Sequence, residues 1–472
     1  MIKTVLVNKK NIIKNSYYKK VNFVTIKDID DEEIQVEEET YKAYIKLYEF
    51  LKSINIEIGI ASAYRSLDYQ QKIYNDFEKL YGKDYAEKYV APVGASEHHT
   101  GLAIDISVKL EDKYSLNDLT HEEEFVFEKI HKHLKDYGFI LRYPKGKEHI
   151  TGYPYEPWHI RYVGEFIANI ITENNYTLEE YLSNYNGIVL VDKEKNITSF
   201  DVVNQISNLF GIKKVGHTGT LDPIATGVLV VCIGSATKLV DELTCNDKEY
   251  IASVELGTLT DTLDNTGKIL KEEIVTKTKK EILEVLNSFK GRYLQEVPIY
   301  SAVKINGKKL YEYARENIEI ELPKREVEIT AIELIDDIEY KNDKTYFKFR
   351  CSVSKGTYIR SLIRDIASKL NTVGIMTDLR RIRQGKFKIE DSILIENINK
   401  NSLINIIDIL DYKKIELTSD IKKQVLNGTI INNVYNSDEI LFISNNEAIA
   451  LYKKYDKDKN KLKPYKMFKG GR

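Results

Sequence analysis

A glycine-rich loop around a single carboxylate constrains the fold of this chain more than any other stretch. Residues 216–227 read Gly-His-Thr-Gly-Thr-Leu-Asp-Pro-Ile-Ala-Thr-Gly, a composition that favours a shaped loop over a regular element. The apolar run 228–233 follows and ends at Gly234, which predicts a buried strand. A rigid loop held by a strand can present its acid, Asp222, as a nucleophile or base. An aspartate before proline can also simply open a turn.

The composition is typical of a soluble globular protein with several domains. The chain has 472 residues, 42% of them hydrophobic and 30% charged, which suggests about three domains of roughly 150 residues each. No apolar run approaches the roughly 20 residues that span a bilayer. The first ten residues also lack the apolar core of a signal peptide, so we expect a cytoplasmic protein. The three cysteines fit neither a disulfide framework nor a zinc cluster.

Histidine and charge are unevenly distributed along the chain. Seven of the eight histidines precede residue 160, and only His217 follows it. Residues 1–185 have a net charge of −7 and the remainder has +5, and a basic part is typical of polyanion binders. Two chemistries on one chain are the simplest explanation.

Hydrophobic spacing and breaker residues predict the main elements. We expect a helix over 121–137 that ends at Gly138, and a second helix that begins at Thr198 or Ser199 and ends at Gly211. The other predicted segments are an acidic loop or helix start (27–40), a helical stretch (68–90), a polar join (172–186), strands at 188–191 and 250–256 within a β-rich region (246–355), and a small β-rich module from about 393.

Two strings in the first part of the chain offer the ligands of a catalytic zinc ion. Residues 96–105 read Ser-Glu-His-His-Thr-Gly-Leu-Ala-Ile-Asp, and residues 156–162 read Glu-Pro-Trp-His-Ile-Arg-Tyr. Catalytic zinc takes three protein ligands and keeps one position open, and His98, Asp105 and His159 can supply them. Any one of these histidines, taken alone, is better explained as a surface or core residue.

Two further residues fit hydrolysis at such a site. Glu156 lies three positions before His159 and can take a proton from the attacking water. Arg65, in the string Ser-Ala-Tyr-Arg-Ser, can hold a carboxylate or a developing oxyanion.

These strings resemble the VanY-like D-alanyl-D-alanine carboxypeptidases, which are zinc peptidases. The resemblance covers roughly residues 5–170 and includes Gly-Phe-Ile-Leu-Arg-Tyr at 138–143. It implies that His98, Asp105 and His159 bind Zn2+ and that Glu156 is the catalytic base. It further implies that Arg65 stabilises charge and Ser96 contacts a peptide ending in D-Ala, whereas His99 has no role. Members of this family are usually exported, whereas this sequence shows no export signal. The substrate could therefore be a cytoplasmic muropeptide, a dipeptide, or none.

The second part resembles the bacterial tRNA pseudouridine synthase B (TruB) family from about residue 186 onward. The Asp222 loop is followed, in family order, by Lys-Glu-Tyr, Gly-Thr-Leu-Thr-Asp-Thr-Leu-Asp, Pro-Ile-Tyr-Ser-Ala-Val-Lys, Ser-Lys-Gly-Thr-Tyr-Ile-Arg and Leu-Arg-Arg, at 248–250, 257–264, 298–304, 354–360 and 379–381. The implied fold class is α+β in a multidomain chain. A small zinc carboxypeptidase α+β domain precedes a mixed α/β pseudouridine synthase domain with a C-terminal PUA-like β module.

The TruB resemblance assigns roles to individual residues. Asp222 is the expected nucleophile, and whether it attacks the base or the sugar stays open. Arg360 would pair with Asp222, because a buried carboxylate needs a charged partner to stay ionised. Tyr250 would stack on the extruded uracil. Matches to base-pocket positions are His217, Tyr358 and Leu379, and candidate phosphate contacts are Lys213, Lys214, Arg364, Arg380, Arg381 and Arg383.

One departure from the TruB pattern lies near the start of the second part. Lys193 begins the string Lys-Glu-Lys-Asn where the family often has Lys-Pro-x-Gly. Asn196 tolerates left-handed backbone geometry, so we expect the turn to form.

We therefore predict a fusion that isomerises uridine 55 in the T-loop of tRNA, without a cofactor, and carries a zinc-dependent carboxypeptidase. The predicted parts are a carboxypeptidase domain (1–171), a linker (172–186), a synthase domain (187–392) and an RNA-binding module (393–472). Two alternatives stay open. The peptidase could be the only active enzyme, with an RNA-binding module behind it, or two separate proteins of neighbouring genes could be joined in this sequence.

Overall fold

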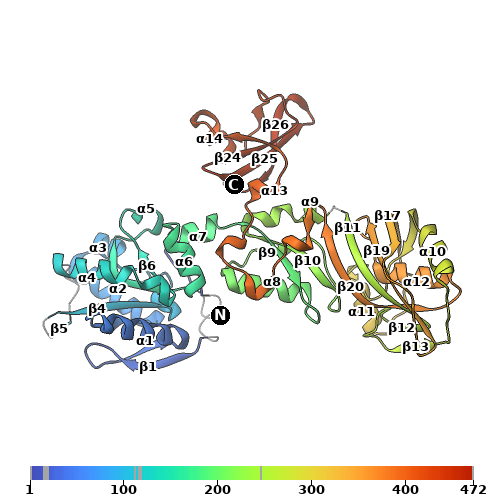
Figure 1. Cartoon of the computed structure of the whole chain (residues 1–472). Helices are drawn as coiled ribbons and strands as arrows, with labels where there is room; N and C mark the ends of the chain where they lie inside the picture. The colour runs from blue at the N-terminus through green and yellow to red at the C-terminus, as the bar shows by residue number, and fades with distance from the viewer. Residues whose placement is uncertain (1–2, 14–20, 111–112, 115–119, 245–246, 470–472) are drawn as a thin grey trace. The chain divides into compact units, whose positions relative to one another are not determined.

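The computed structural model describes residues 3–13, 21–110, 113–114, 120–244 and 247–469 (Figure 1). The chain forms two compact units. The first unit consists of Met1–Asn186 and Ile206–Lys214, and the second consists of Gly187–Gln205 and Val215–Arg472. The backbone therefore passes from one unit to the other at three places.

An antiparallel sheet forms the centre of the first unit. Its strand order is β3 (Ile58–Ser62), β4 (Ala103–Leu110), β7 (Glu156–Tyr162) and β6 (Phe139–Tyr143), and β5 (Lys113–Tyr114) pairs with β4. Strands β1 (Phe23–Lys27) and β2 (Glu33–Glu37) form a separate ribbon. Alternating residues of β4, such as Ile104, Ile106 and Val108, are buried in the core, as the twofold repeat of a strand dictates.

Helices and short 3-10 turns surround this sheet: α1 (Glu38–Ser53), α2 (Leu67–Tyr81), α3 (Lys83–Tyr89), η2 (Glu97–Thr100), α4 (His121–His131), η3 (Leu134–Tyr137), α5 (Glu148–Thr151), α6 (Glu165–Glu173) and α7 (Leu178–Asn184). The predicted helix over 121–137 exists but is interrupted after His131. Its remainder is η3, which ends at Gly138 with φ of 80°, as predicted. The acidic segment 27–40 contains β2 and the start of α1.

The polar segment predicted as a linker contains helix α7. A capping box formed by Thr177 and Glu180 begins this helix, which is a strong local start signal. Leu178 and Tyr181 are fully buried, and the whole segment belongs to the first unit.

A large mixed sheet dominates the second unit. Its order is β14 (Gly291–Glu296), β17 (Lys324–Leu334), β19 (Lys344–Val353), β11 (Lys248–Leu256), β20 (Gly374–Gln384), β10 (Thr226–Ile233) and β8 (Gly187–Lys193). Figure 1 shows β19, β11 and β20 side by side. Only β10 and β20 pair in parallel along this path. Short strands β18 (Glu339–Lys341), β21 (Phe387–Lys388) and β9 (Val215–His217) extend it at β19, β20 and β10.

The remaining elements around this sheet include two small ribbons and several helices. Strand β12 (Thr258–Thr260) pairs with β13 (Ile269–Glu272), and β15 (Lys304–Ile305) pairs with β16 (Lys308–Lys309). The helices are α8 (Ser199–Phe210), η4 (Gly234–Leu239), α9 (Val240–Thr244), α10 (Lys279–Ser288), α11 (Leu310–Arg315) and α12 (Ile359–Lys369). The predicted strands at 188–191, 228–233 and 250–256 are confirmed, as is the helix that ends before Gly211.

A smaller sheet forms the predicted β-rich module near the C-terminus. Its order is β22 (Lys413–Glu416), β24 (Glu439–Ser444), β25 (Glu447–Tyr455), β26 (Asp458–Met467) and β23 (Ile431–Asn432). Turns η5 (Ile389–Asp391), η6 (Ile395–Asn397) and η7 (Lys400–Ser402) and helix α13 (Ile406–Ile409) precede it, and α14 (Ser419–Leu426) packs on it. The multidomain α and β architecture expected from the sequence is confirmed. Among the described residues, no helix is long and apolar enough to cross a membrane.

Candidate active sites

The sheet of the first unit brings the three predicted zinc ligands together. Asp105 of β4 and His159 of β7 lie directly opposite each other in the antiparallel pair. His98 approaches from η2, so that its Nε2 lies 3.1 Å from Asp105 Oδ2. His159 Nδ1 lies 3.0 Å from Asp105 Oδ1. One ligand atom from each residue falls within 4.8 Å of the others, which is the spacing that a single small cation needs.

The chemistry of these three residues fits a divalent cation. The Nδ1 of His98 lies 2.6 Å from the carbonyl oxygen of Ala63, which leaves Nε2 free to bind metal. Burial lowers the pKa of His98 to about 4, which keeps this imidazole neutral. Burial by itself lowers the pKa of His159, but the neighbouring carboxylates of Asp105 and Glu97 outweigh burial and raise it to about 9. Asp105 Oδ1 is buried without a hydrogen-bond partner in the part of the chain that the structure describes.

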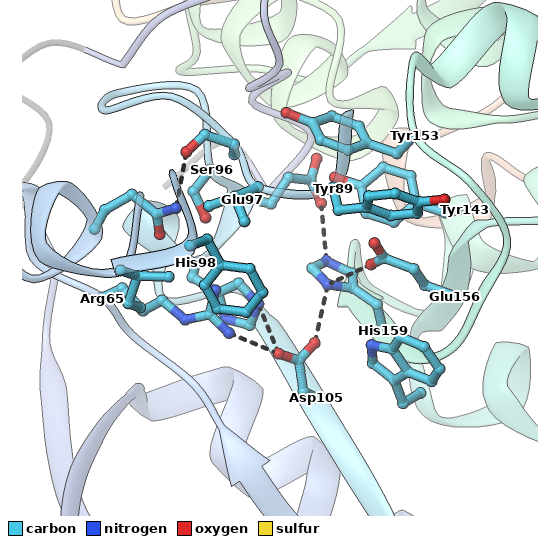
Figure 2. Close-up of a pocket in the computed structure, with 16 residues that line it drawn as sticks. Arg65, Tyr89, Ser96, Glu97, His98, Asp105, Tyr143, Tyr153, Glu156 and His159 are labelled. Carbon is cyan, nitrogen blue, oxygen red and sulfur yellow. Dashed lines mark hydrogen bonds and ion pairs between the residues drawn. The ribbon is translucent and has the colours of Figure 1, made fainter. Parts of the chain in front are cut away.

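A pocket of about 370 Å3 opens onto these ligands (Figure 2). Glu156 lies at its edge, with Oε2 3.7 Å from His159 Nδ1. Burial raises the pKa of Glu156 to about 7, a value suited to both accepting and giving a proton near neutral pH. Arg65 donates from Nη2 to Asp105 Oδ2 at 2.9 Å. Ser96 is buried and also lines the pocket.

His99, to which the sequence assigned no role, is completely buried beside this site. Its Nδ1 lies 2.7 Å from the carbonyl oxygen of Arg65, and its Nε2 accepts from the amide of Gly94 at 3.1 Å. These two bonds tie the backbone of Arg65 to the loop that precedes η2.

Sequence reasoning missed a set of buried charges behind His159. Glu97, Arg142 and Arg161 have no exposed side-chain surface, and Glu97 forms an ion pair with each of the two arginines. Glu97 and Arg142 both lie inside strings that resemble the VanY-like family. Their ion pair could not be predicted from those strings, because the two residues are far apart in the sequence.

In the second unit, the guanidinium of Arg360 makes two contacts with the carboxylate of Asp222. Asp222 lies in the loop between β9 and β10, and Arg360 lies in the first turn of α12. Arg360 Nε is 2.9 Å from Asp222 Oδ2, and Nη2 is 3.2 Å from Oδ1. The guanidinium also donates to the carbonyl oxygens of Thr262 and Tyr300 at 3.0 and 2.9 Å. This fork geometry fixes the orientation of the carboxylate.

The backbone around Asp222 is held at both ends of its loop. Gly227 has φ of 104°, and a Cβ there would lie 2.2 Å from the carbonyl oxygen of Arg381, so only glycine fits. Asn196 has φ of 69°, which confirms the predicted left-handed turn, and its amide donates to Pro223 O at 2.8 Å. Lys193 is buried and donates to carbonyls of the same turn.

Three of the predicted base-pocket residues, Tyr250, Tyr358 and Leu379, lie near Asp222 or its neighbour Leu221. Tyr250 and Leu379 belong to the same buried apolar cluster as Leu221. Burial raises the pKa of Tyr250 and of Tyr358, and the nearby charge of Asp222 adds to both shifts. His217 of β9 accepts the amide of Gly219 on its Nδ1 at 3.3 Å.

The candidate phosphate contacts differ in their surroundings. Arg381 is completely buried, and it donates to Val228 O at 2.7 Å and Gly219 O at 3.0 Å. The prediction that it contacts phosphate is therefore wrong, because its guanidinium has no exposed surface and donates instead to backbone carbonyl oxygens. Arg380 is partly exposed but pairs with Asp192, at 2.7 Å for the closer contact.

Comparison with known proteins matches each unit to a family. Residues 207–359 match the family model of the TruB family pseudouridylate synthase, N-terminal domain, and residues 33–165 match that of D-alanyl-D-alanine carboxypeptidase. The tRNA pseudouridine synthase B of Clostridium tetani is 42% identical over 280 residues, which are 58% of this chain and 93% of that protein. That of Staphylococcus aureus is 42% identical over 303 residues, 60% of this chain and 99% of that protein.

Among solved structures, a variant of the vancomycin resistance D,D-pentapeptidase VanY in complex with Zn(II) is 29% identical to this chain. The match covers 39% of this chain and 99% of that chain, with a TM-score of 0.33.

Proposed function

This chain belongs to the tRNA pseudouridine synthase B family through its C-terminal part and carries a VanY D-alanyl-D-alanine carboxypeptidase domain before it, and we propose that both parts are active enzymes. The second unit isomerises uridine 55 in the T-loop of tRNA to pseudouridine. The first unit removes D-alanine from peptides that end in D-Ala, with the help of zinc. Because tRNA is one substrate, the proposed location is the cytoplasm.

The paired Asp222 and Arg360 carry the proposal for the second unit. Two contacts from Arg360 fix the orientation of the carboxylate, which a nucleophile needs. During the reaction the bond between uracil N1 and C1′ of the ribose breaks, the base turns, and a carbon–carbon bond forms between C1′ and C5, while C5 loses a proton and N1 gains one. An RNA-binding module without activity would have no use for this ion pair, so the pair argues against the alternative in which only the peptidase works.

The neighbouring residues would bind the extruded uridine. Tyr250 would stack on the base, and His217, Tyr358 and Leu379 would line the pocket that excludes water from it. In this proposal residues 187–392 form the catalytic domain and residues 393–472 bind the rest of the tRNA.

Replacement of Asp222 by asparagine tests this assignment. Asp222→Asn keeps the shape of the side chain but removes the nucleophilic charge, so pseudouridine formation should stop while tRNA binding persists, because binding depends on many phosphate contacts. Asp241→Asn, on the exposed surface of α9, is the matched control. Substantial pseudouridine formation by Asp222→Asn on a T-loop RNA would rule out Asp222 as the nucleophile.

The close approach of His98, Asp105 and His159 carries the proposal for the first unit. These residues would hold Zn2+, and the ion would supply a Lewis acid for the peptide carbonyl. Glu156 would take a proton from the attacking water and give it to the leaving nitrogen of D-alanine as the carbon–nitrogen bond breaks. Arg65 and Ser96 would bind the carboxylate end of the peptide.

Metal analysis tests the zinc site directly. The purified chain should carry or take up one zinc ion, and His159→Ala should lose nearly all of it. His149→Ala is the control, because His149 in α5 lies outside the proposed ligand set. A wild-type protein that neither contains nor takes up zinc would contradict the peptidase assignment.

A further inference from the structure

A chain of buried ion pairs leads from the proposed metal ligand His159 into the interior of the first unit. Glu97 is fully buried, and its Oε1 accepts from Arg142 Nε at 2.7 Å and pairs with Arg161 Nη1 at 2.9 Å. Both arginine side chains are also fully buried. Burying one carboxylate with two guanidinium groups is costly, so a purpose beyond simple packing is expected for Glu97.

The other oxygen of Glu97 faces the metal site. Its Oε2 lies 3.9 Å from Nε2 of His159 (Figure 2). Both atoms are buried, and within the described residues neither has a hydrogen-bond partner. Nδ1 of His159 lies against Asp105, so Nδ1 is the nitrogen that would bind the metal, and Nε2 would then carry the proton. A carboxylate is the natural acceptor for that proton.

Arg142 has a second carboxylate partner, which lies outside the residues that match the carboxypeptidase family. Arg142 donates from Nη1 and Nη2 to the two oxygens of Glu179 at 2.9 and 2.6 Å. Glu179 lies in α7 and also accepts from Asn8 Nδ2 at 3.2 Å. The family match spans residues 33–165, so both Asn8 and α7 lie beyond it.

We propose that Glu97 is a positioning residue for His159, and that Glu179 of α7 completes the zinc site by holding Arg142 against Glu97. This inference rests on the proposed zinc site. When Nδ1 binds metal, Glu97 accepts the Nε2 proton and fixes both the tautomer and the ring orientation of His159. Helix α7 is then part of the peptidase machinery and not a passive connection between the two units.

The neighbouring glutamates of α7 offer a matched pair of variants. Glu179→Gln removes the charge that pairs with buried Arg142. Glu180→Gln removes a charge that, among the residues the structure describes, forms its ion pair with the partly exposed Lys147, and glutamine preserves its capping role. Glu97→Gln tests the central residue. All three are made in the full chain, and circular dichroism of the metal-free proteins reports whether each variant is folded.

Zinc affinity, measured by competition with a chromophoric chelator, is the first measurement. Loss of such supporting hydrogen bonds typically weakens metal binding about 10–100-fold, so we expect a change of that size for Glu97→Gln and a smaller weakening for Glu179→Gln. Glu180→Gln should stay within about twofold of wild type, as expected for a surface pair. The second measurement is the visible absorption of the Co2+-substituted proteins, which should shift for Glu97→Gln because the ligand geometry changes.

The outcomes separate this inference from the proposed function. A folded Glu97→Gln variant with wild-type zinc affinity and an unchanged Co2+ spectrum would overturn the positioning role. Equal zinc affinities for Glu179→Gln and Glu180→Gln would overturn the part assigned to α7. If the wild type itself binds no zinc, the proposed peptidase function fails first, and this inference fails with it.

Discussion

Replacing Arg360 by lysine tests whether the guanidinium orients the Asp222 carboxylate, because the substitution keeps the positive charge. Arg360 makes two contacts to Asp222 and two to the carbonyl oxygens of Thr262 and Tyr300. A lysine ammonium is a compact point charge that cannot reproduce this planar fork. The variant therefore keeps the charge near Asp222 but loses the geometry that orients it.

The size of the effect follows from these contacts. Loss of a charged donor to two carbonyl groups costs about 1.5 kcal/mol each, so the free energy of unfolding of the second unit should fall by about 3 kcal/mol. The Asp222 side chain is 34% exposed, so water replaces part of the hydrogen bonding that Asp222 loses when Arg360 is changed. A carboxylate displaced by about 1 Å typically costs on the order of 100-fold in rate. We expect kcat to fall about 100-fold while KM for tRNA changes little.

Release of tritium from C5 of uridine in a T-loop RNA measures the reaction, since the new bond displaces that hydrogen. Thermal unfolding of the same samples reports stability. Arg292→Lys, at an exposed position of β14, is the control and should leave both quantities unchanged. A kcat for Arg360→Lys within threefold of wild type would refute the idea that the fork geometry aims Asp222.

Three other predictions follow from the separate sites and from strained or buried positions. A zinc chelator should stop release of D-alanine and leave pseudouridine formation unchanged, because the two proposed residue sets lie in different units; zinc-reversible loss of both activities would contradict this. Gly227→Ala should destabilise the second unit by about 2 kcal/mol or more, whereas Gly356→Ala, with φ of 87° but open space around it, should cost less in the same denaturant titration. Because burial lowers the pKa of Lys193 from 10.5 to about 8, the unfolded chain holds an extra proton between these values. The unfolding free energy of wild type relative to Lys193→Met should therefore rise from pH 8 to 10.5, and a flat difference would argue against this shift.

Structural features that depend on a short string with a specialised residue could be predicted from the sequence. Asp105 and His159 were predicted to meet, and the antiparallel register of β4 and β7 places them opposite each other. Gly138 and Asn196 were predicted to terminate or turn the backbone, and both have positive φ. Such features are local, because one residue type decides the backbone geometry.

Contacts across long sequence separations could not be read. A lone arginine such as Arg381 looks the same in the sequence whether it faces a phosphate or is buried under a loop, and the structure buries it. The support of Glu97 by Arg142 and then by Glu179 depends on how β6 and α7 pack. The break after His131 in the predicted helix likewise depends on packing and not on a helix-breaking residue. Each is decided by tertiary structure, which residue spacing does not encode.

The path of the backbone between the two units limits how this chain can be divided. Residues 206–214 belong to the first unit although the residues on both sides of them belong to the second. Within the first unit, Tyr181 donates its hydroxyl to the carbonyl oxygen of Phe210 at 2.7 Å. A protease or a genetic break that acts only at residue 186 would therefore take this segment away from the first unit. The two units cannot be exchanged as independent cassettes by a single cut.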